Sequence, residues 1–390
     1  MQDDHTLRRH RYRVHAPAPG LLAGSLLAWS FLGPAASAQT LQDAIDEASP
    51  GDTIRIDPGD YVRPVTVDKA ITLVPGTPGT VRLAGISGGA ATVVGITFDG
   101  TLAAKTVTLA SCESGLRFVD CVFQGPGTRG ALVRAGAEGV TFEGCGFASL
   151  IEAVGLEAGA VSLTLEDTEV TECILALVGP DVPFCDDGPG REPAARCASG
   201  CGTITLTGVR FTGGDSHITI SGDYTVSITE SRFAGPSQWA IAAGGVRLEM
   251  ESTDCVSEGG AGVGLVLRSV SGYVRQSRIV AWDTALAIDD GGCRRYSDIT
   301  IGGALEAAND IGSQTLSLDL GQPEPVDAEF NFWGTLICSE ALSLIAGQTV
   351  SRITDAGHAQ TVTCPGTPAL PSTWGRIKVR FSPGSGGLRP

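Results

Sequence analysis

The fold is decided by the stretch GLRFVDCVF at residues 115–123, because the chain repeats its pattern. Apolar and polar residues alternate in this stretch, and a small residue and another apolar one follow. Further copies are GVTFEGCGF (139–147), SLTLEDTEV (162–170), TITLTGVRF (203–211) and TVSITESRF (225–233). The apolar anchors of successive units are separated by 24, 23, 41, 22, 22 and 24 residues, and they are Phe118, Phe142, Leu165, Leu206, Ile228, Met250 and Val274. A repeat of this length indicates stacked units, and the alternation indicates strands.

A second short apolar segment separates the copies, as in ALVRAG, ITISGD and LAIDDG. Units of 22–24 residues leave no room for a crossover helix. Each strand is therefore expected to pair in parallel with its own copy one turn away, at about 4.8 Å. We predict an all-β fold, a single-stranded parallel β-helix of about a dozen coils.

The alternation also predicts which side chains point inward and which point outward. The outward row of the first strand is Thr97, Arg117, Thr141, Thr164, Thr205, Ser227, Glu249, Tyr273 and Thr300. The inward row of the second strand is Leu109, Val133, Leu156, Leu177, Ile220, Ala242, Leu267 and Ile288. Its outward row is Leu132, Gly155, Ala176, Thr219, Ile241, Val266 and Ala287. Because this last row is apolar, we expect a loop, the C-terminal tail or a partner to cover it.

Two segments resemble a known group of proteins. Residues 41–76, LQDAIDEASPGDTIRIDPGDYVRPVTVDKAITLVPG, look like the opening of the right-handed parallel β-helices of the pectin lyase-like superfamily, and Asn331-Phe332-Trp333-Gly334 resembles an Asn-x-Trp-Gly segment found late in them. The resemblance covers roughly residues 39–365. It implies a short N-terminal capping helix with an apolar face formed by Leu41, Ala44, Ile45 and Ala48. It does not imply one activity, because the superfamily holds lyases, glycosidases, esterases, epimerases and adhesins.

The composition of the two ends predicts an exported protein. Residues 1–38 have a basic start, an apolar run and Ala-Ser-Ala, as in a secretory signal peptide that is removed. The apolar run is too short for a stable membrane anchor, and no second one follows. Residues 39–365 form the β-helix domain, interrupted by an inserted Cys-containing loop at 179–201, and residues 366–390 form a Pro/Gly-rich tail. We predict a secreted protein, extracellular or on the cell surface.

Charge and cysteine content restrict the partners. Removal of residues 1–38 takes four arginines and two aspartates from 27 basic and 43 acidic residues, which leaves a formal charge of −18. That charge repels nucleic acid, so we expect none as a partner. All eleven cysteines follow the signal, and an exported chain permits disulfides. Cys121 and Cys145 occupy the same position in successive units, as a thiol ladder or as a disulfide. The cysteine spacing of the inserted loop is not that of a zinc site, and we predict no metal.

The stretch ALAIDDGG at residues 285–292 is the first candidate for chemistry. The alignment places Asp289 beside Arg268 of the preceding coil, and opposite charges on adjacent rungs stabilise a stacked surface. The same alignment places Arg134 beside Glu157. A catalytic interpretation uses the same groups: Asp289, Asp290 and Arg268 would act on a glycosidic bond or a uronate proton, and Arg294 would bind an anionic sugar.

Related enzymes that use paired aspartates carry an Asn-Thr-Asp segment one coil earlier and a Gly-His-Gly segment later. The preceding coil here reads GLVLRSV, and no Gly-His-Gly occurs in the chain. No catalytic set of the superfamily is therefore complete.

A second candidate cluster consists of Asp215, His217 and Trp239. His217 and Trp239 align on successive coils, where the indole would stack on a sugar ring and the other two would hydrogen-bond to it. We predict a non-enzymatic scaffold without a cofactor that binds glycans or a polysaccharide or cell-surface partner. The alternative is a polysaccharide lyase or glycosidase acting on an acidic polysaccharide, and a lyase would use calcium as its cofactor.

Overall fold

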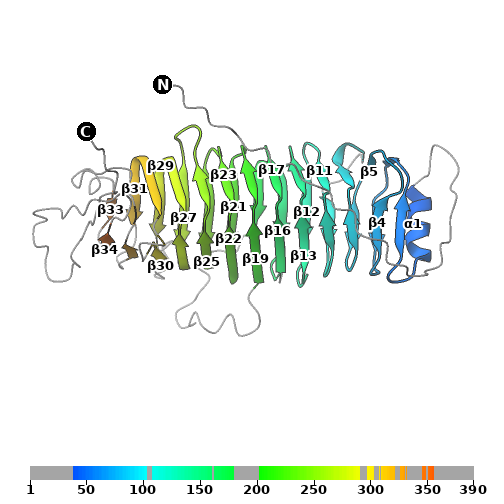
Figure 1. Ribbon diagram of the computed structural model, residues 1–390, viewed down its shortest axis with the longest axis horizontal. Helices are drawn as coiled ribbons and strands as arrows, with labels where there is room; N and C mark the ends of the chain where they lie inside the picture. Colours follow the sequence, from blue (N-terminus) through cyan, green and yellow to red (C-terminus); the bar gives the residue numbers. More distant parts are fainter. Residues whose placement is uncertain are drawn as a thin grey trace, which may run out of the picture. The chain divides into compact units, whose positions relative to one another are not determined.

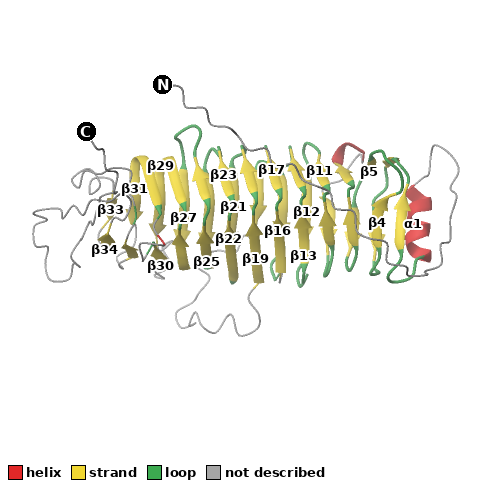
Figure 2. Cartoon of the chain, in the orientation of Figure 1, coloured by secondary structure: helices red, strands yellow, loops and turns green. Residues whose placement is uncertain are grey.

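The computed structural model describes residues 38–102, 108–159, 162–179, 202–289, 297–302, 307, 309–320, 326–329, 331, 345–347 and 350–354. All of them belong to one compact unit, residues 35–390. They form short parallel strands stacked coil upon coil, with helix α1 (Ala38–Glu47) at one end (Figures 1 and 2). The predicted parallel β-helix is therefore confirmed. The predicted signal up to residue 37, the inserted loop from residue 180 and the tail lie outside the described residues.

The first strand of every coil belongs to one 13-stranded parallel sheet, called here the first sheet. Its strands are β1 (Thr53–Ile56), β4 (Thr72–Pro75), β7 (Thr92–Val94), β10 (Arg117–Val119), β13 (Val140–Glu143), β16 (Ser162–Glu166), β19 (Gly202–Thr207), β22 (Tyr224–Thr229), β25 (Arg247–Glu251), β28 (Ser271–Arg275), β30 (Asp298–Ile301), β32 (Val326–Glu329) and β34 (Val350–Thr354). The register joins Phe118 to Phe142, and Phe142 to Leu165, as the repeat predicts. The outward row is confirmed except at its start, because Thr92, not Thr97, lies opposite Arg117.

The other strands form a 21-stranded sheet that bends into a second and a third row. The second row is β2 (Gly59–Tyr61), β5 (Val81–Leu83), β8 (Thr97–Asp99), β11 (Val122–Gln124), β14 (Gly146–Ala148), β17 (Glu169–Thr171), β20 (Arg210–Thr212), β23 (Arg232–Ala234) and β26 (Asp254–Val256). The third row is β3 (Val65–Val67), β6 (Ile86–Gly88), β9 (Thr108–Cys112), β12 (Arg129–Val133), β15 (Glu152–Leu156), β18 (Leu175–Val178), β21 (Ser216–Ser221), β24 (Trp239–Gly244) and β27 (Val263–Arg268). A 3-10 turn, η1 (Gly100–Leu102), follows β8.

Nine coils of the described chain, β1 to β27 taken three at a time, have three separate strands. In the coils that follow, β29 (Arg278–Asp289) and β31 (Asp310–Leu320) each join the second and third rows in one long strand, and β33 (Ile345–Gly347) continues the third row. About nine regular coils thus replace the predicted dozen.

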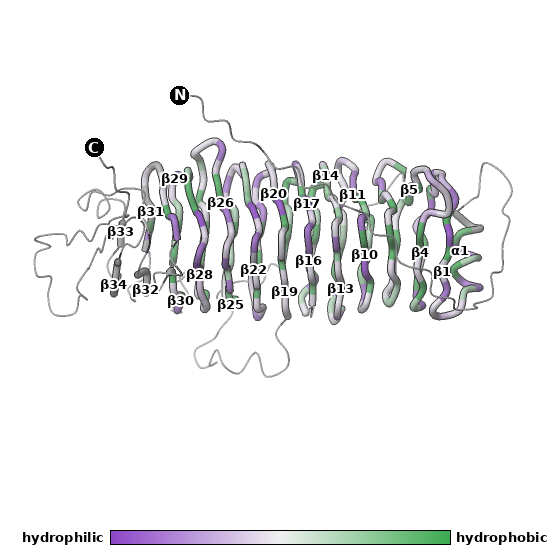
Figure 3. The backbone as a smooth tube through the Cα atoms, in the orientation of Figure 1, coloured by the Kyte–Doolittle hydropathy of each residue, from purple (hydrophilic) through white to green (hydrophobic). Residues whose placement is uncertain are grey.

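Apolar side chains from all three rows fill the inside of the coils, and hydrophobic and hydrophilic residues alternate along the backbone (Figure 3). The largest side chains stack in columns, because the same position recurs one strand spacing away. Phe98, Phe123 and Phe147 are parallel neighbours with centroids 4.8 and 4.6 Å apart, and Phe118 and Phe142 are 4.9 Å apart. Such contacts add about 0.5–1.5 kcal/mol per pair to the gain from burial.

The corner between the first sheet and the second row holds polar side chains inside the core, and we call it the polar corner. In eight coils one residue there has a left-handed backbone, with φ between 48° and 66°: Gly95, Asp120, Gly144, Asp167, Gly208, Glu230, Ser252 and Gln276. The next residue points inward: in six coils it is Cys121, Cys145, Thr168, Ser231, Thr253 or Ser277, and in two it is the apolar Ile96 or Val209. Asn309 and Asn331 continue the polar row, because Ser277 N donates to Asn309 Oδ1 and Asn309 N donates to Asn331 Oδ1. These side chains hydrogen-bond to backbone groups that the turn leaves free, for example Ser277 Oγ to Arg275 O at 2.8 Å.

The corner at the start of the third row is built from small residues, and we call it the small corner. Its buried members are Gly85, Leu109, Gly130, Ala153, Ala176, His217, Ala240, Gly264 and Ala285, all small except Leu109 and His217. The residue after each of them also points inward, so alternation fails at this bend. For that reason Ile241 and Ala176, predicted to face outward, are buried, while Ala242, predicted to face inward, lies half-exposed opposite Val266.

Helix α1 covers the first coil, as the resemblance implies. Leu41 and Ile45 on its apolar face are buried in the core. Gln42 satisfies the unpaired edge of β3, because its Oε1 accepts from Thr66 N at 2.8 Å and its Nε2 donates to Thr66 O at 3.0 Å. Lys69 Nζ donates to Ala48 O at 3.1 Å just beyond the helix, where a cation also opposes the helix dipole. These contacts protect the end of the stack from pairing with another chain.

Candidate functional site

The aspartate pair lies at the end of β29. The register places Asp289 opposite Arg268 of β27, as the alignment predicted. The side chain of Asp289, together with Asp290 and Arg294, lies outside the described residues. The catalytic role of these side chains therefore stays a prediction. The placement of Asp289 beside Arg268 on the neighbouring strand is set by the strand register.

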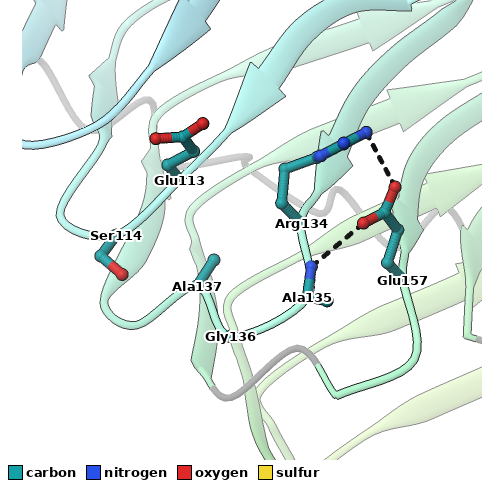
Figure 4. A pocket seen from close by; sticks show the side chains of 7 residues that line it. All are labelled: Glu113, Ser114, Arg134, Ala135, Gly136, Ala137 and Glu157. Atoms are coloured by element: carbon teal, nitrogen blue, oxygen red, sulfur yellow. Dashed lines mark hydrogen bonds and ion pairs between the residues drawn. The ribbon is translucent and has the colours of Figure 1, made fainter. Parts of the chain in front are cut away.

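The equivalent place on earlier coils shows how this surface treats its charges. Arg134 Nη1 lies 2.8 Å from Glu157 Oε1, which confirms the predicted pair. The other oxygen, Glu157 Oε2, accepts from Ala135 N at 3.1 Å (Figure 4). A shallow pocket of about 380 Å³ lies here, and Glu113 and Ser114 form its far side. Both oxygens of Glu157 therefore accept from donors, Arg134 and Ala135 N. Glu113, the other carboxylate that lines the pocket, does not take part in these two contacts.

A neighbouring outward row of the third-row strands also pairs an arginine with a glutamate of the next coil. Arg129 at the start of β12 lies opposite Glu152 at the start of β15, and their side chains pair at 2.8 Å. Glu152 is buried against the sheet, since a Cβ added at Gly155 would lie 1.9 Å from its Oε1. Glycoside hydrolysis needs two carboxyl groups about 5–9.5 Å apart that are available to the substrate. In both described rows the carboxylates opposite arginines are engaged in ion pairs.

His217 does not face the surface. Its side chain is 1% exposed and belongs to the small corner, where its ring lies 5.5 Å from Phe211 and 5.9 Å from Phe233. Burial lowers the pKa of His217 to about 4, although a hydrogen bond with Gly213 O at 2.8 Å opposes this shift. The imidazole is thus neutral at physiological pH. The prediction that it hydrogen-bonds a sugar at the surface is wrong for this conformation, because the bend turns two consecutive residues inward.

The other two members of that cluster lie outside the core. Asp215 is exposed in the turn before β21, where its Oδ1 accepts from Ser237 Oγ at 3.0 Å. Trp239 begins β24 opposite Ser216, not opposite His217 as predicted. Its half-buried indole donates from Nε1 to Thr219 Oγ1 at 3.1 Å, which fixes the ring over the outer face of β21. The structure therefore separates the imidazole from the indole.

A second charged cluster was not identified from the sequence. Arg82 bridges Asp60 at 3.1 Å and Asp99 at 2.7 Å across three coils. Burial raises the pKa of Asp99, but hydrogen bonds from Thr101, Gln124 and Arg82 more than offset it and hold that pKa well below its ordinary value. All these groups are satisfied by one another, so the cluster fixes the turn after β8. The sequence signal available for this cluster was the spacing of opposite charges, 22 residues from Asp60 to Arg82 and 17 from Arg82 to Asp99.

Within the described residues, no group of three or more His, Cys, Asp or Glu side chains is placed to hold a metal ion. The same part of the chain contains no helix with the length and apolar character needed to cross a bilayer. No family model matches the chain, and a search of curated proteins finds no match either. The parallel β-helix thus rests on the structure, and the likeness to the pectin lyase-like superfamily rests on the sequence segments alone.

Proposed function

We propose that this protein is an exported, non-enzymatic β-helix scaffold that binds glycans on the outer face of the third row. The observation that carries the proposal is the state of its titratable groups. The imidazole first considered for the site is buried and neutral, and the carboxylates of Glu152 and Glu157 are paired with arginines of the preceding coil. A general acid or base must reach the substrate with a proton to give or take, and these groups do not meet that condition.

The outer face between the ion pairs and the aspartates supports a binding role. Its middle row is uncharged and half-exposed from β18 to β29: Val178, Thr219, Ala242, Val266 and Ala287. Trp239 lies against the start of this row. Carbohydrate sites combine apolar and aromatic surface with a few polar groups that fix orientation. Sugar rings offer matching apolar faces, so a chain lying along the stack would contact several coils.

The test is retention on a panel of immobilised neutral and acidic polysaccharides, combined with an assay for released reducing ends and unsaturated uronates, with and without calcium. We expect retention without product. Trp239→Ala should weaken retention about tenfold, as for the loss of one aromatic contact of about 1.4 kcal/mol. Tyr273→Ala is the matched control, because Tyr273 is a half-exposed aromatic side chain on the first sheet, away from the third row.

Two results would overturn the proposal. Retention on no polysaccharide, by a protein shown to be folded, would remove glycans as the ligand. Product formation by the wild type that disappears in the Asp289→Ala/Asp290→Ala variant would establish the alternative, a lyase or glycosidase acting through ALAIDDGG.

A further inference from the structure

The polar corner contains two cysteines on successive coils. Cys121 follows the left-handed Asp120, and Cys145 follows the left-handed Gly144. The flanking strands are in register on both sides, with Val119 opposite Glu143 and Val122 opposite Gly146. The two cysteines are therefore one strand spacing apart, about 4.8 Å between α carbons. Disulfides bridge α carbons separated by about 4.4–6.8 Å.

The two side chains also face each other. Cys121 is 0% and Cys145 2% exposed, both are free thiols, and their side chains lie close enough to interact with one another. Each thiol also donates to a carbonyl of its own turn, Cys121 Sγ to Val119 O at 3.4 Å and Cys145 Sγ to Glu143 O at 3.5 Å. The two sulfur atoms thus occupy equivalent positions at the same corner, with no side chain between them.

Other buried cysteines do not share this arrangement. Cys112 lies opposite Val133 on one side and Gly88 on the other. Cys255 lies opposite Phe233 and Ile279. Among the cysteines of the described residues, Cys121 and Cys145 form the pair that the strand register brings together.

We propose that Cys121 and Cys145 are an oxidation site that joins two coils of the exported protein by a disulfide. One thiolate attacks a sulfur of a donor disulfide, such as oxidised glutathione, and releases one thiol of the donor. The other thiolate then displaces the second donor thiol and closes the Cys121–Cys145 bond. Two electrons and two protons pass from the cysteine pair to the donor, which leaves as two thiols.

The burial of both sulfur atoms determines when the disulfide can form. A donor disulfide cannot reach either sulfur once the coils are stacked, so the exchange takes place while the chain folds. The bond closes a loop from residue 121 to residue 145, one complete coil. Closing a loop restricts the unfolded chain and raises the stability of the folded one. The proposal is independent of glycan binding, because the polar corner lies inside the core.

The experiment is oxidative refolding. The full chain is unfolded and reduced, then refolded in a buffer of reduced and oxidised glutathione. Free thiols are alkylated after denaturation, and the peptides are mapped without reduction. We expect a linked peptide pair containing Cys121 and Cys145, and a Tm several degrees above that of protein refolded under reducing conditions.

The variants separate this pair from the other cysteines. Cys121→Ser/Cys145→Ser should fold, because the same corner position already holds Ser231 and Ser277. It should lose the linked peptide and show a smaller difference in Tm between oxidised and reduced protein. Cys255→Ala should keep both. Recovery of Cys121 and Cys145 alkylated in the oxidatively refolded wild type, or of either one linked to a different cysteine, would overturn the proposal.

Discussion

The two corners of each coil solve the same problem with different chemistry. Both turn the chain through the edge of the core, and both place a side chain inside. The polar corner contains groups such as Ser277 and Asn309, whereas the small corner contains glycine or alanine in seven of its nine buried, described members. The difference lies in the backbone. At the polar corner a left-handed residue breaks the ladder and leaves buried amide and carbonyl groups without strand partners.

The consequence is that polar side chains enter this core where the backbone needs them. Ser277 N donates to Asn309 Oδ1 at 2.8 Å, and Asn309 Nδ2 donates to Val274 O at 2.9 Å and to Asn331 Oδ1 at 2.9 Å. The small corner also skips one residue in its register, for example between Ser216 opposite Trp239 and Ile218 opposite Ile241, but it is limited by space. A Cβ at Gly264 would lie 2.5 Å from Ala285 O. One corner thus depends on hydrogen bonds and the other on volume.

Removing a side chain from the polar corner should produce the largest effect. Asn309→Ala leaves the amide of Ser277 buried without its acceptor. It also removes one hydrogen bond each from Val274 O, which keeps Gly302 N, and from Asn331 Oδ1, which keeps the backbone N–H of residue 309. The unpaired amide costs about 1–3 kcal/mol and each of the other two hydrogen bonds about 1 kcal/mol, so we expect the free energy of unfolding to fall by about 4 kcal/mol. Urea unfolding measures the change, and amide exchange at Ser277 should become faster.

Two further variants at polar positions provide stability changes with which the loss in Asn309→Ala can be compared. Asn309→Ser keeps an acceptor for Ser277 and should cost less than the alanine variant. Ser227→Ala removes an outward hydroxyl from the first sheet and should change stability by less than about 0.5 kcal/mol. A loss at Asn309 no larger than that at Ser227 would show that the corner does not depend on its hydrogen bonds.

The sequence predicts the regular part of the fold because one signal, alternation, acts on every rung. The register of Thr141 with Thr164 and of Thr205 with Ser227 follows from it. Ile241 was assigned to the wrong side because the small corner inserts a second inward residue. About nine coils, not a dozen, have three separate strands, because β29 and β31 each take the place of two strands in the coils that follow.

The candidate site was less predictable, for a physical reason. Sequence spacing places Arg134 beside Glu157, but it does not reveal that Ala135 N also binds that carboxylate. His217 follows Asp215 and Ser216, a polar context typical of a surface turn, and its burial depends on the bend of the strand. The state of a titratable group follows from local geometry that a repeat pattern does not contain.

His217 is the one polar side chain among the described members of the small corner, so pH tests how that corner tolerates charge. Its folded pKa of about 4 lies below the unfolded value of about 6.5. As pH falls below 6.5, the unfolded chain binds a proton that the folded chain does not. The stability present above pH 6.5 is therefore lost as pH falls towards 4, by about 3 kcal/mol.

His217→Ala isolates this contribution, because alanine is the residue of the neighbouring coils at Ala176 and Ala240. We expect wild type to lose about 3 kcal/mol more than the variant between pH 7 and pH 4, measured by urea unfolding at each pH. Parallel pH profiles in the two proteins would mean that the imidazole is not buried in the neutral form.

Adding one methyl group to the small corner should give the smallest of the three effects. Gly264→Ala places a Cβ 2.5 Å from Ala285 O and 2.7 Å from Ile279 Cγ2, so the coil must shift to admit it. Overpacking of this kind costs about 2 kcal/mol. Gly146→Ala is the matched control, since nothing lies within 4 Å of its added Cβ, and its stability should stay equal to wild type or rise slightly. Equal thermal unfolding of the two variants would mean that the small corner has room to spare, and the contrast between a corner limited by hydrogen bonds and one limited by volume would no longer hold.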